Sequence, residues 1–134
     1  MPALTHERVP IGASGDIVTV RQRVRSRAID SGFSLVDQTK IVTAASELAR
    51  NALDYGGGGS VTIESVDEGS RKGLRLTFED SGPGIPDIEL ALRDGYTTGR
   101  GLGLGLSGAR RLVNEFQLQS TPGEGTRVTV TRWR

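Results

Sequence analysis

Four consecutive glycines at positions 56–59 constrain the fold more than any other stretch of this 134-residue chain. Apolar side chains recur at helical spacing just before them, at Ile41, Ala45, Leu48 and Ala52. Four glycines in succession lose too much backbone entropy to remain helical, so this long helix must end at about Tyr55. The chain is therefore expected to leave a core-packing helix here and to enter a different element.

The segments after the glycines alternate between apolar and polar residues, as half-buried strands do. Residues 61–66 and 74–79 predict an antiparallel hairpin, and residues 117–120 and 126–133 predict a second one. A shorter segment, residues 7–11, contains a proline and is better suited to the edge of a sheet than to its centre.

Helical periodicity appears in three places. The first helix is expected from Asp16, a plausible N-cap, to Gly32, a natural C′ residue. The second begins after Ser34, and the third starts where a glycine-rich run ends, at residues 104–106, and continues to Phe116. These elements predict a two-layer α/β sandwich in which helices cover one face of a mixed β-sheet. A short helix at 88–93 and a mobile lid at 95–105 are expected between the hairpins.

Composition narrows the class of function. The length fits one domain, residues 1–134, and the net charge of +1 gives no broad field that would attract nucleic acid or an anionic membrane. There is no cysteine, no apolar run long enough to span a membrane and no signal peptide at the N-terminus. We therefore expect a cytoplasmic protein whose ligands bind at a local site.

The second predicted helix also carries a polar pair. Glu47 and Asn51 are four residues apart and share one helical face. Taken alone, the pair is typical of a solvated surface. It becomes chemically useful if a phosphate-bearing ligand lies above it, because a carboxylate can deprotonate a hydroxyl and an amide oxygen can bind a hard cation.

Two glycine-rich segments could hold such a ligand. DSGPG at 80–84 follows a predicted strand, and GLGLG at 101–105 precedes a helix, where backbone N–H groups and the helix dipole favour an anion. Gly103 to Gly108 also match a dinucleotide-binding pattern, but the required preceding strand is missing. A single glycine loop would more often be ordinary turn chemistry.

The four motifs together resemble the GHKL ATP-binding superfamily of gyrase B, Hsp90, histidine kinases and MutL. The matching residues are Glu47 and Asn51, then Asp80, Gly82 and Gly84, then Gly101, Gly103 and Gly105, then Gly123, Gly125 and Thr126. Within the superfamily, the segments around these residues are similar to the anti-sigma-factor serine/threonine kinases, most of all to the RsbT branch of stressosome switch kinases. The run GLGLGL departs from that branch toward the histidine-kinase pattern.

The resemblance implies a role for each matching residue. Asp80 would accept a hydrogen bond from the adenine amino group, helped by Thr126. Asn51 would bind Mg²⁺ through its side-chain oxygen, and Glu47 would be the catalytic base for a serine or threonine hydroxyl. The glycines, Gly82, Gly84, Gly101, Gly103 and Gly105, would allow close backbone approach to ATP. Arg100 at the edge of the lid would reach the γ-phosphate.

By the same resemblance, the protein would phosphorylate a STAS-domain antagonist and activate a PP2C-type phosphatase when released. The alternative is an anti-sigma factor that sequesters a sigma factor while ATP controls partner exchange. A histidine-kinase fragment is disfavoured because the one histidine, His6, lies outside any predicted amphipathic helix. An ATPase of the gyrase or Hsp90 type would need further domains.

Overall fold

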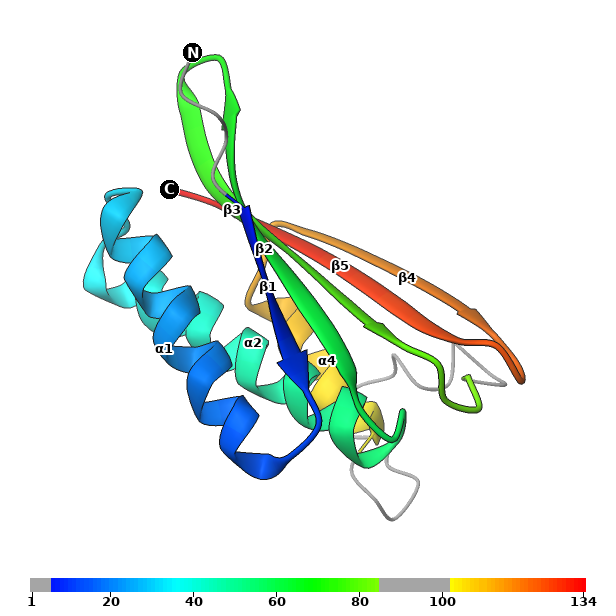
Figure 1. Cartoon of the computed structure of the whole chain (residues 1–134). Coiled ribbons are helices and arrows are strands. Elements are labelled where there is room, and N and C mark those ends of the chain that lie inside the picture. Colours follow the sequence, from blue (N-terminus) through cyan, green and yellow to red (C-terminus); the bar gives the residue numbers. More distant parts are fainter. Residues whose placement is uncertain (1–5, 85–101) are drawn as a thin grey trace.

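The computed structural model describes residues 6–84 and 102–134, and in this part of the chain three helices cover one face of a five-stranded sheet (Figure 1). The helices are α1 (Ser14–Asp30), α2 (Leu35–Asp54) and α4 (Leu102–Arg111). The strands are β1 (His6–Ile11), β2 (Gly59–Glu68), β3 (Arg71–Asp80), β4 (Glu115–Thr121) and β5 (Gly125–Trp133). The predicted two-layer α/β sandwich is confirmed.

The strand order is β1-β2-β3-β5-β4, which places the predicted short strand β1 at an edge. All four pairings between these strands are antiparallel. The prediction was a mixed sheet, which would also contain a parallel pair, and no parallel pair is formed among these five strands. The reason is the connection after β3. The chain passes through α4 to the far edge, forms β4 there, and then returns by a tight turn to insert β5 between β4 and β3.

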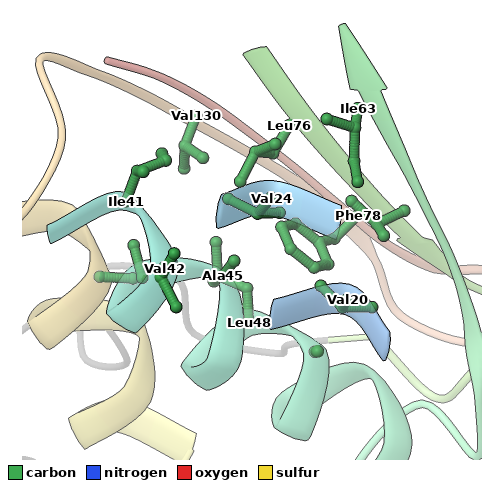
Figure 2. Packing of buried hydrophobic residues seen from close by; sticks show 14 of the residues in the cluster. Val20, Val24, Ile41, Val42, Ala45, Leu48, Ile63, Leu76, Phe78 and Val130 are labelled. Carbon is green, nitrogen blue, oxygen red and sulfur yellow. The ribbon is translucent and has the colours of Figure 1, made fainter. Parts of the chain in front are cut away.

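The core lies between the helical layer and the sheet. Figure 2 shows Val20 and Val24 of α1 and Leu48 of α2 pointing toward Leu76 and Phe78 of β3. These side chains are almost completely buried. Burial of one such side chain contributes roughly 1.5–3 kcal/mol, so the apolar stripes of α1 and α2 fix both helices against the sheet.

The caps of the first two helices agree with the predictions from the sequence except at one residue, Asp16. Ser34 caps α2 by accepting a hydrogen bond from the Asp37 N–H at 3.2 Å, and Gly32 has a φ of 81° after α1, both as predicted. Asp16 is not the N-cap of α1, which is Ala13. Asp16 is three residues further on, where its carboxylate accepts from the N–H groups of Gly12 at 2.8 Å and Ala13 at 3.0 Å. The acid therefore satisfies free N–H groups from inside the first turn.

The third helix differs from the prediction at both ends. It begins at Leu102, so Gly103 and Gly105 lie within its first turn. The cost of a helical glycine, about 1 kcal/mol, is offset by the burial of later residues such as Leu106. The helix ends at Arg111, and Phe116 belongs to β4. Leu112 and Phe116 are four residues apart, a spacing that fits both a helix and a strand.

No helix in the described part of the chain is long and apolar enough to cross a membrane. The predicted short helix at 88–93 lies outside the described residues, as does most of the predicted lid at 95–105.

Candidate nucleotide site

A pocket opens between α2, the N-terminal half of α4 and the adjacent ends of β3 and β5. It is lined by Leu48, Asn51, Ala52, Tyr55, Gly56, Phe78, Asp80, Pro83, Gly84, Leu106, Thr126 and Val128. Three residues predicted from separate motifs, Asn51, Asp80 and Thr126, therefore reach one cavity. The chain brings them together because α2 packs directly on the sheet face that contains Phe78 and Val128.

Asp80 is the last residue of β3 and is half-buried. In the sheet it lies between Gly59 of β2 and Thr126 of β5. One carboxylate oxygen accepts a hydrogen bond from the Gly82 N–H at 3.0 Å. Burial raises the pKa of Asp80, while the backbone N–H groups of Gly82 and Thr126 partly oppose that rise by stabilising the carboxylate. The remaining acceptor capacity of the carboxylate is suited to a donor on a ligand.

Gly56 is a site residue that was predicted from the sequence only as the end of the preceding helix. A Cβ atom at this position would collide with the Cβ and Cγ atoms of Asp80. A Cβ on Gly82 would lie 2.6 Å from the Gly56 Cα. These glycines allow the end of α2 and the DSGPG segment to close on Asp80 from two sides. The sequence feature that could have indicated this role of Gly56 is the position of the glycine run directly after the helix that contains Glu47 and Asn51.

Thr126 is held in place by a second hydroxyl, that of Ser120, which was not predicted from the sequence. Its Oγ1 lies 2.9 Å from the Oγ of Ser120 on β4, and Ser120 also donates to the Gly125 carbonyl at 3.2 Å. Ser120 and Thr126 are register partners across the turn between β4 and β5. This contact fixes the Thr126 hydroxyl at the pocket wall next to Asp80.

Asn51 has a buried side-chain nitrogen, Nδ2, without a hydrogen-bond partner in the described part of the chain. A buried amide without a partner is costly, by about 1–3 kcal/mol, and a polar ligand in the pocket would relieve that cost. Glu47 lies one turn earlier on the same helix and is half-buried, but it does not line the pocket. Asn51 therefore lines the cavity, and Glu47 lies one helical turn away from it on α2.

The walls of the pocket are mainly apolar. Leu48, Ala52, Phe78, Leu106 and Val128 contribute to them. Leu48 and Ala52 belong to the predicted core stripe of α2, so their second role could not be separated from packing in the sequence. A mainly apolar pocket with a carboxylate in its lining fits a flat heteroaromatic ring that carries a hydrogen-bond donor.

The remaining predicted residues are placed as follows. Gly84 lines the pocket, and Gly82 contacts Asp80 through its N–H group. Gly103 and Gly105 are in the first turn of α4, whose Leu106 reaches the pocket. Arg100 and Gly101 lie outside the described residues.

Among the described residues, no three His, Cys, Asp or Glu side chains gather in a way that could hold a metal ion. A cation at this site would therefore depend on Asn51 and on oxygens of a bound ligand. Mg²⁺ is commonly held in this manner, with one or two protein ligands, phosphate oxygens and water.

Comparisons with known proteins agree with this geometry. The family described as histidine kinase-, DNA gyrase B- and HSP90-like ATPases matches residues 36–133. The serine/threonine-protein kinase RsbT of Bacillus subtilis is 49% identical over 125 residues, covering 93% of this chain and 94% of the relative. An anti-sigma F factor of a Thermoanaerobacter species is 33% identical over 98 residues, covering 69% of this chain and 68% of the relative.

Solved structures share the fold at low sequence identity. The RsbU and RsbW domains of a Mycobacterium tuberculosis protein superpose with a TM-score of 0.67 at 22% identity, covering 97% of this chain and 33% of that one. The mycobacterial sensor histidine kinase MprB gives a TM-score of 0.58 at 23% identity, covering 96% of this chain and 97% of that one.

Proposed function

Because the chain belongs to the family of histidine kinase-, DNA gyrase B- and HSP90-like ATPases and is a serine/threonine-protein kinase of the partner-switching kind, we propose that its substrate is a STAS-domain antagonist. The phosphoryl donor would be Mg²⁺-bound ATP. The observation that supports this proposal most directly is that Asn51, Asp80 and Thr126 line the same pocket. We further propose that residues 1–134 form one kinase domain and that the protein works in the cytoplasm.

Asp80 would select adenine. Its carboxylate is fixed by the Gly82 N–H and keeps acceptor capacity for the exocyclic amino group of the base. Thr126, oriented by Ser120, would add a hydroxyl next to it. The apolar walls would exclude water from the ring, so a base without that donor would leave the ligand-facing acceptor capacity of the Asp80 carboxylate unused, at a cost of about 1–3 kcal/mol.

Asn51 fits the polar end of the same ligand, since its buried Nδ2 is a donor without a partner in the described part of the chain and could donate to a ligand oxygen. When bound, Mg²⁺ and ATP supply the transferable phosphoryl group and the neutralising charge that phosphoryl transfer requires. Asn51 would hold the cation through its side-chain oxygen. Gly84, Gly101 and the first turn of α4, with Gly103 and Gly105, would give the phosphates backbone N–H groups. Arg100 would reach the γ-phosphate.

Glu47 would orient the attacking hydroxyl and accept its proton. Its position one turn from Asn51 on the same helix supports this role, because Asn51 lines the pocket. A positioned base contributes typically 10²–10⁴-fold in rate. Its removal should therefore affect transfer far more than nucleotide binding.

The test is transfer of labelled γ-phosphate from ATP to a purified STAS-domain protein. Glu47→Ala should retain nucleotide affinity and lose about 10²-fold or more in transfer, whereas Asn51→Ala should lose Mg²⁺-dependent transfer as well. Glu68→Ala is the matched control, since Glu68 is an exposed acid in the β2–β3 hairpin. Undiminished transfer by the Glu47 variant would exclude its role as base.

We also propose a second partner, a PP2C-type phosphatase that the kinase activates when it is free of its substrate. The alternative function is sequestration of a sigma factor with ATP controlling partner exchange, which the similarity to anti-sigma F factors favours. Pull-down of the protein with a sigma factor and, separately, with the STAS protein and the phosphatase distinguishes the two. Retention of the sigma factor alone would favour the alternative.

A further inference from the structure

Helix α1 has a second stripe of side chains that the fold does not use. Its buried stripe consists of Ile17, Val20, Val24 and Ala28. The other stripe consists of Val18, Arg21, Gln22, Arg25 and Ile29, which share one helical face at spacings of three and four residues. We call these five residues the outer face of α1. Val18 and Ile29 are 52% and 55% exposed, so the face begins and ends on an exposed apolar side chain.

A shallow hollow lies on this face. It is lined by Val18, Arg21, Gln22, Arg25 and Val42. Val42 comes from α2 and is almost fully buried, so it forms part of the floor, and the two arginines stand beside it. The hollow therefore has an apolar base and a positively charged border.

The arginines of α1 divide into two pairs with different partners. Arg23 and Arg27, on the flank next to β1, each contact Glu7 at 2.9 Å. Arg21 and Arg25, on the outer face, have no ion-pair partner within residues 6–84 and 102–134. They are also four residues apart on one helix, a spacing at which like charges repel by roughly 0.2–0.5 kcal/mol. The fold compensates one pair of charges and leaves the other available.

We propose that the outer face of α1 docks an acidic amphipathic helix of a partner protein. The apolar residues of that helix would cover Val18, Val42 and Ile29, and its carboxylates would pair with Arg21 and Arg25. Arginine is enriched in protein interfaces because its guanidinium pairs bidentately with carboxylates. Val18 and Ile29 are eleven residues apart, about 16 Å along the helix, so a partner helix of about three turns would span the face.

A second copy of this chain is a poor occupant. A two-fold contact would place the same face on both sides, and the arginines of each copy would meet those of the other. An anionic membrane is also a poor occupant, since two arginines contribute only about 1 kcal/mol each near a charged surface. Charge complementarity thus favours an acidic protein segment.

The docking face is separate from the nucleotide pocket. In the helical layer α2 lies between α1 and α4 (Figure 1), and the hollow shares no lining residue with the pocket. A helix bound on α1 would leave the pocket open. The proposal therefore concerns partner binding and is independent of whether the phosphoryl acceptor is a STAS-domain protein.

The first test uses a labelled synthetic peptide of 16 residues, helical, with a leucine stripe flanked by glutamates, and measures fluorescence anisotropy against the full chain. Arg25→Gln and Val18→Ser should each weaken binding about tenfold, since truncation of an interface anchor typically costs more than 1 kcal/mol. The matched control is Arg23→Gln, on the same helix but on the Glu7 flank, which should change affinity less than about twofold. A peptide with lysine in place of glutamate should not bind.

The second test repeats the three variants with the full-length STAS, phosphatase and sigma partners. The proposal predicts that at least one partner is lost by Arg25→Gln and Val18→Ser while nucleotide affinity is unchanged. Equal binding by the Arg25 and Arg23 variants, for the peptide and for every partner, would overturn it. So would dissociation of a dimer into monomers by Val18→Ser in sedimentation, which would assign the face to a second copy. Failure of phosphoryl transfer alone would sink only the proposed function.

Discussion

Gly56 and Asp80 are in such close contact that a methyl group on the glycine would overlap the aspartate side chain. Gly56 follows the C-cap of α2, and Asp80 ends β3, so the contact joins the helical layer to the sheet at the pocket. The same methyl group would lie 2.7 Å from the Ala52 carbonyl oxygen. Neither the Asp80 Cβ and Cγ atoms nor the Ala52 carbonyl is the far end of a flexible side chain. A methyl group on Gly56 would therefore push the end of α2 and Asp80 apart and change the site.

Substitution of Gly56 by alanine should therefore displace Asp80 and weaken nucleotide binding about tenfold, equivalent to about 1.4 kcal/mol. The measurement is isothermal titration calorimetry with ATP and Mg²⁺. Gly15→Ala is the matched control, because a Cβ at Gly15 meets nothing within 4 Å and the residue is helical. The control should bind nucleotide normally and gain stability, roughly 0.5–1 kcal/mol. Unchanged affinity in the Gly56 variant would show that Asp80 does not contact the ligand.

Nucleotide affinity should also depend on the ionisation of Asp80. Burial raises the pKa of this carboxyl above its ordinary value of 3.8, and only the carboxylate is a full acceptor for an amino group. Affinity for adenosine should thus fall as the pH is lowered toward the raised pKa. Asp80→Asn should bind adenosine more weakly at pH 7 and lose this pH dependence.

The stability of the ligand-free protein should respond in the opposite direction. The folded protein binds the Asp80 proton more tightly than the unfolded chain does, so Asp80 lowers stability as the pH rises from 3.8 through the raised pKa. At pH 7, Asp80→Asn should therefore be at least as stable as the native protein in urea denaturation while it binds adenosine less well. A variant that loses both properties equally would indicate that Asp80 is mainly a structural residue.

A further prediction concerns the ion pair between Arg132 of the last strand and Asp37 near the start of α2. Arg132 donates to the Asp37 carboxylate at 2.6 Å and to the Leu112 carbonyl at 3.0 Å, and its side chain is largely buried. Arg132→Met should leave both acceptors without this donor and lower the free energy of unfolding by about 1–3 kcal/mol. Arg127→Met is the matched control, since the Arg127–Glu79 pair is exposed and should contribute less than about 1 kcal/mol.

The hydrogen bond from Arg132 also holds the pKa of Asp37 below its ordinary value of 3.8. The stabilising effect of the pair is therefore complete above that value and is lost as the pH falls through the lowered pKa. In urea denaturation between pH 2 and pH 5, the native protein should lose more stability than the Arg132→Met variant does. Parallel curves would contradict the assignment.

Much of the fold could be predicted because the elements follow simple periodicities. The spacing of Ile41 and Leu48 and the alternation in residues 74–79 each fit one period only, and the four glycines mark the boundary between the helix and the first hairpin. The prediction that the third helix continues to Phe116 was wrong, because the spacing of four residues between Leu112 and Phe116 fits a helix and a strand equally well. The pairing of Asp37 with Arg132 was out of reach, since no local pattern links residues 95 positions apart.

Some residues of the candidate site could be predicted from the sequence and others could not. Asn51, Asp80 and Thr126 could be proposed because their motifs are short and ordered along the chain, and the structure brings all three to one pocket. Gly56 and Ser120 were missed because their roles depend on neighbours from other elements. A glycine that avoids a collision and a serine that orients another hydroxyl cannot be recognised without those neighbours. Residues 85–101, which include Arg100, lie outside the described part of the chain.

The contact between Ser120 and Thr126 gives the last prediction. Thr126→Val removes the hydroxyl at nearly constant volume and should weaken ATP binding about fivefold, the loss of one hydrogen bond of roughly 1 kcal/mol. Ser120→Ala keeps that hydroxyl but frees its rotation, so a smaller loss, about twofold, is expected. Thr129→Val is the control, since Thr129 lies on the opposite face of β5 and does not line the pocket. Calorimetry of the three variants should give this order, and an equal loss in the Thr129 variant would mean that β5 contributes through sheet stability rather than through the Thr126 hydroxyl.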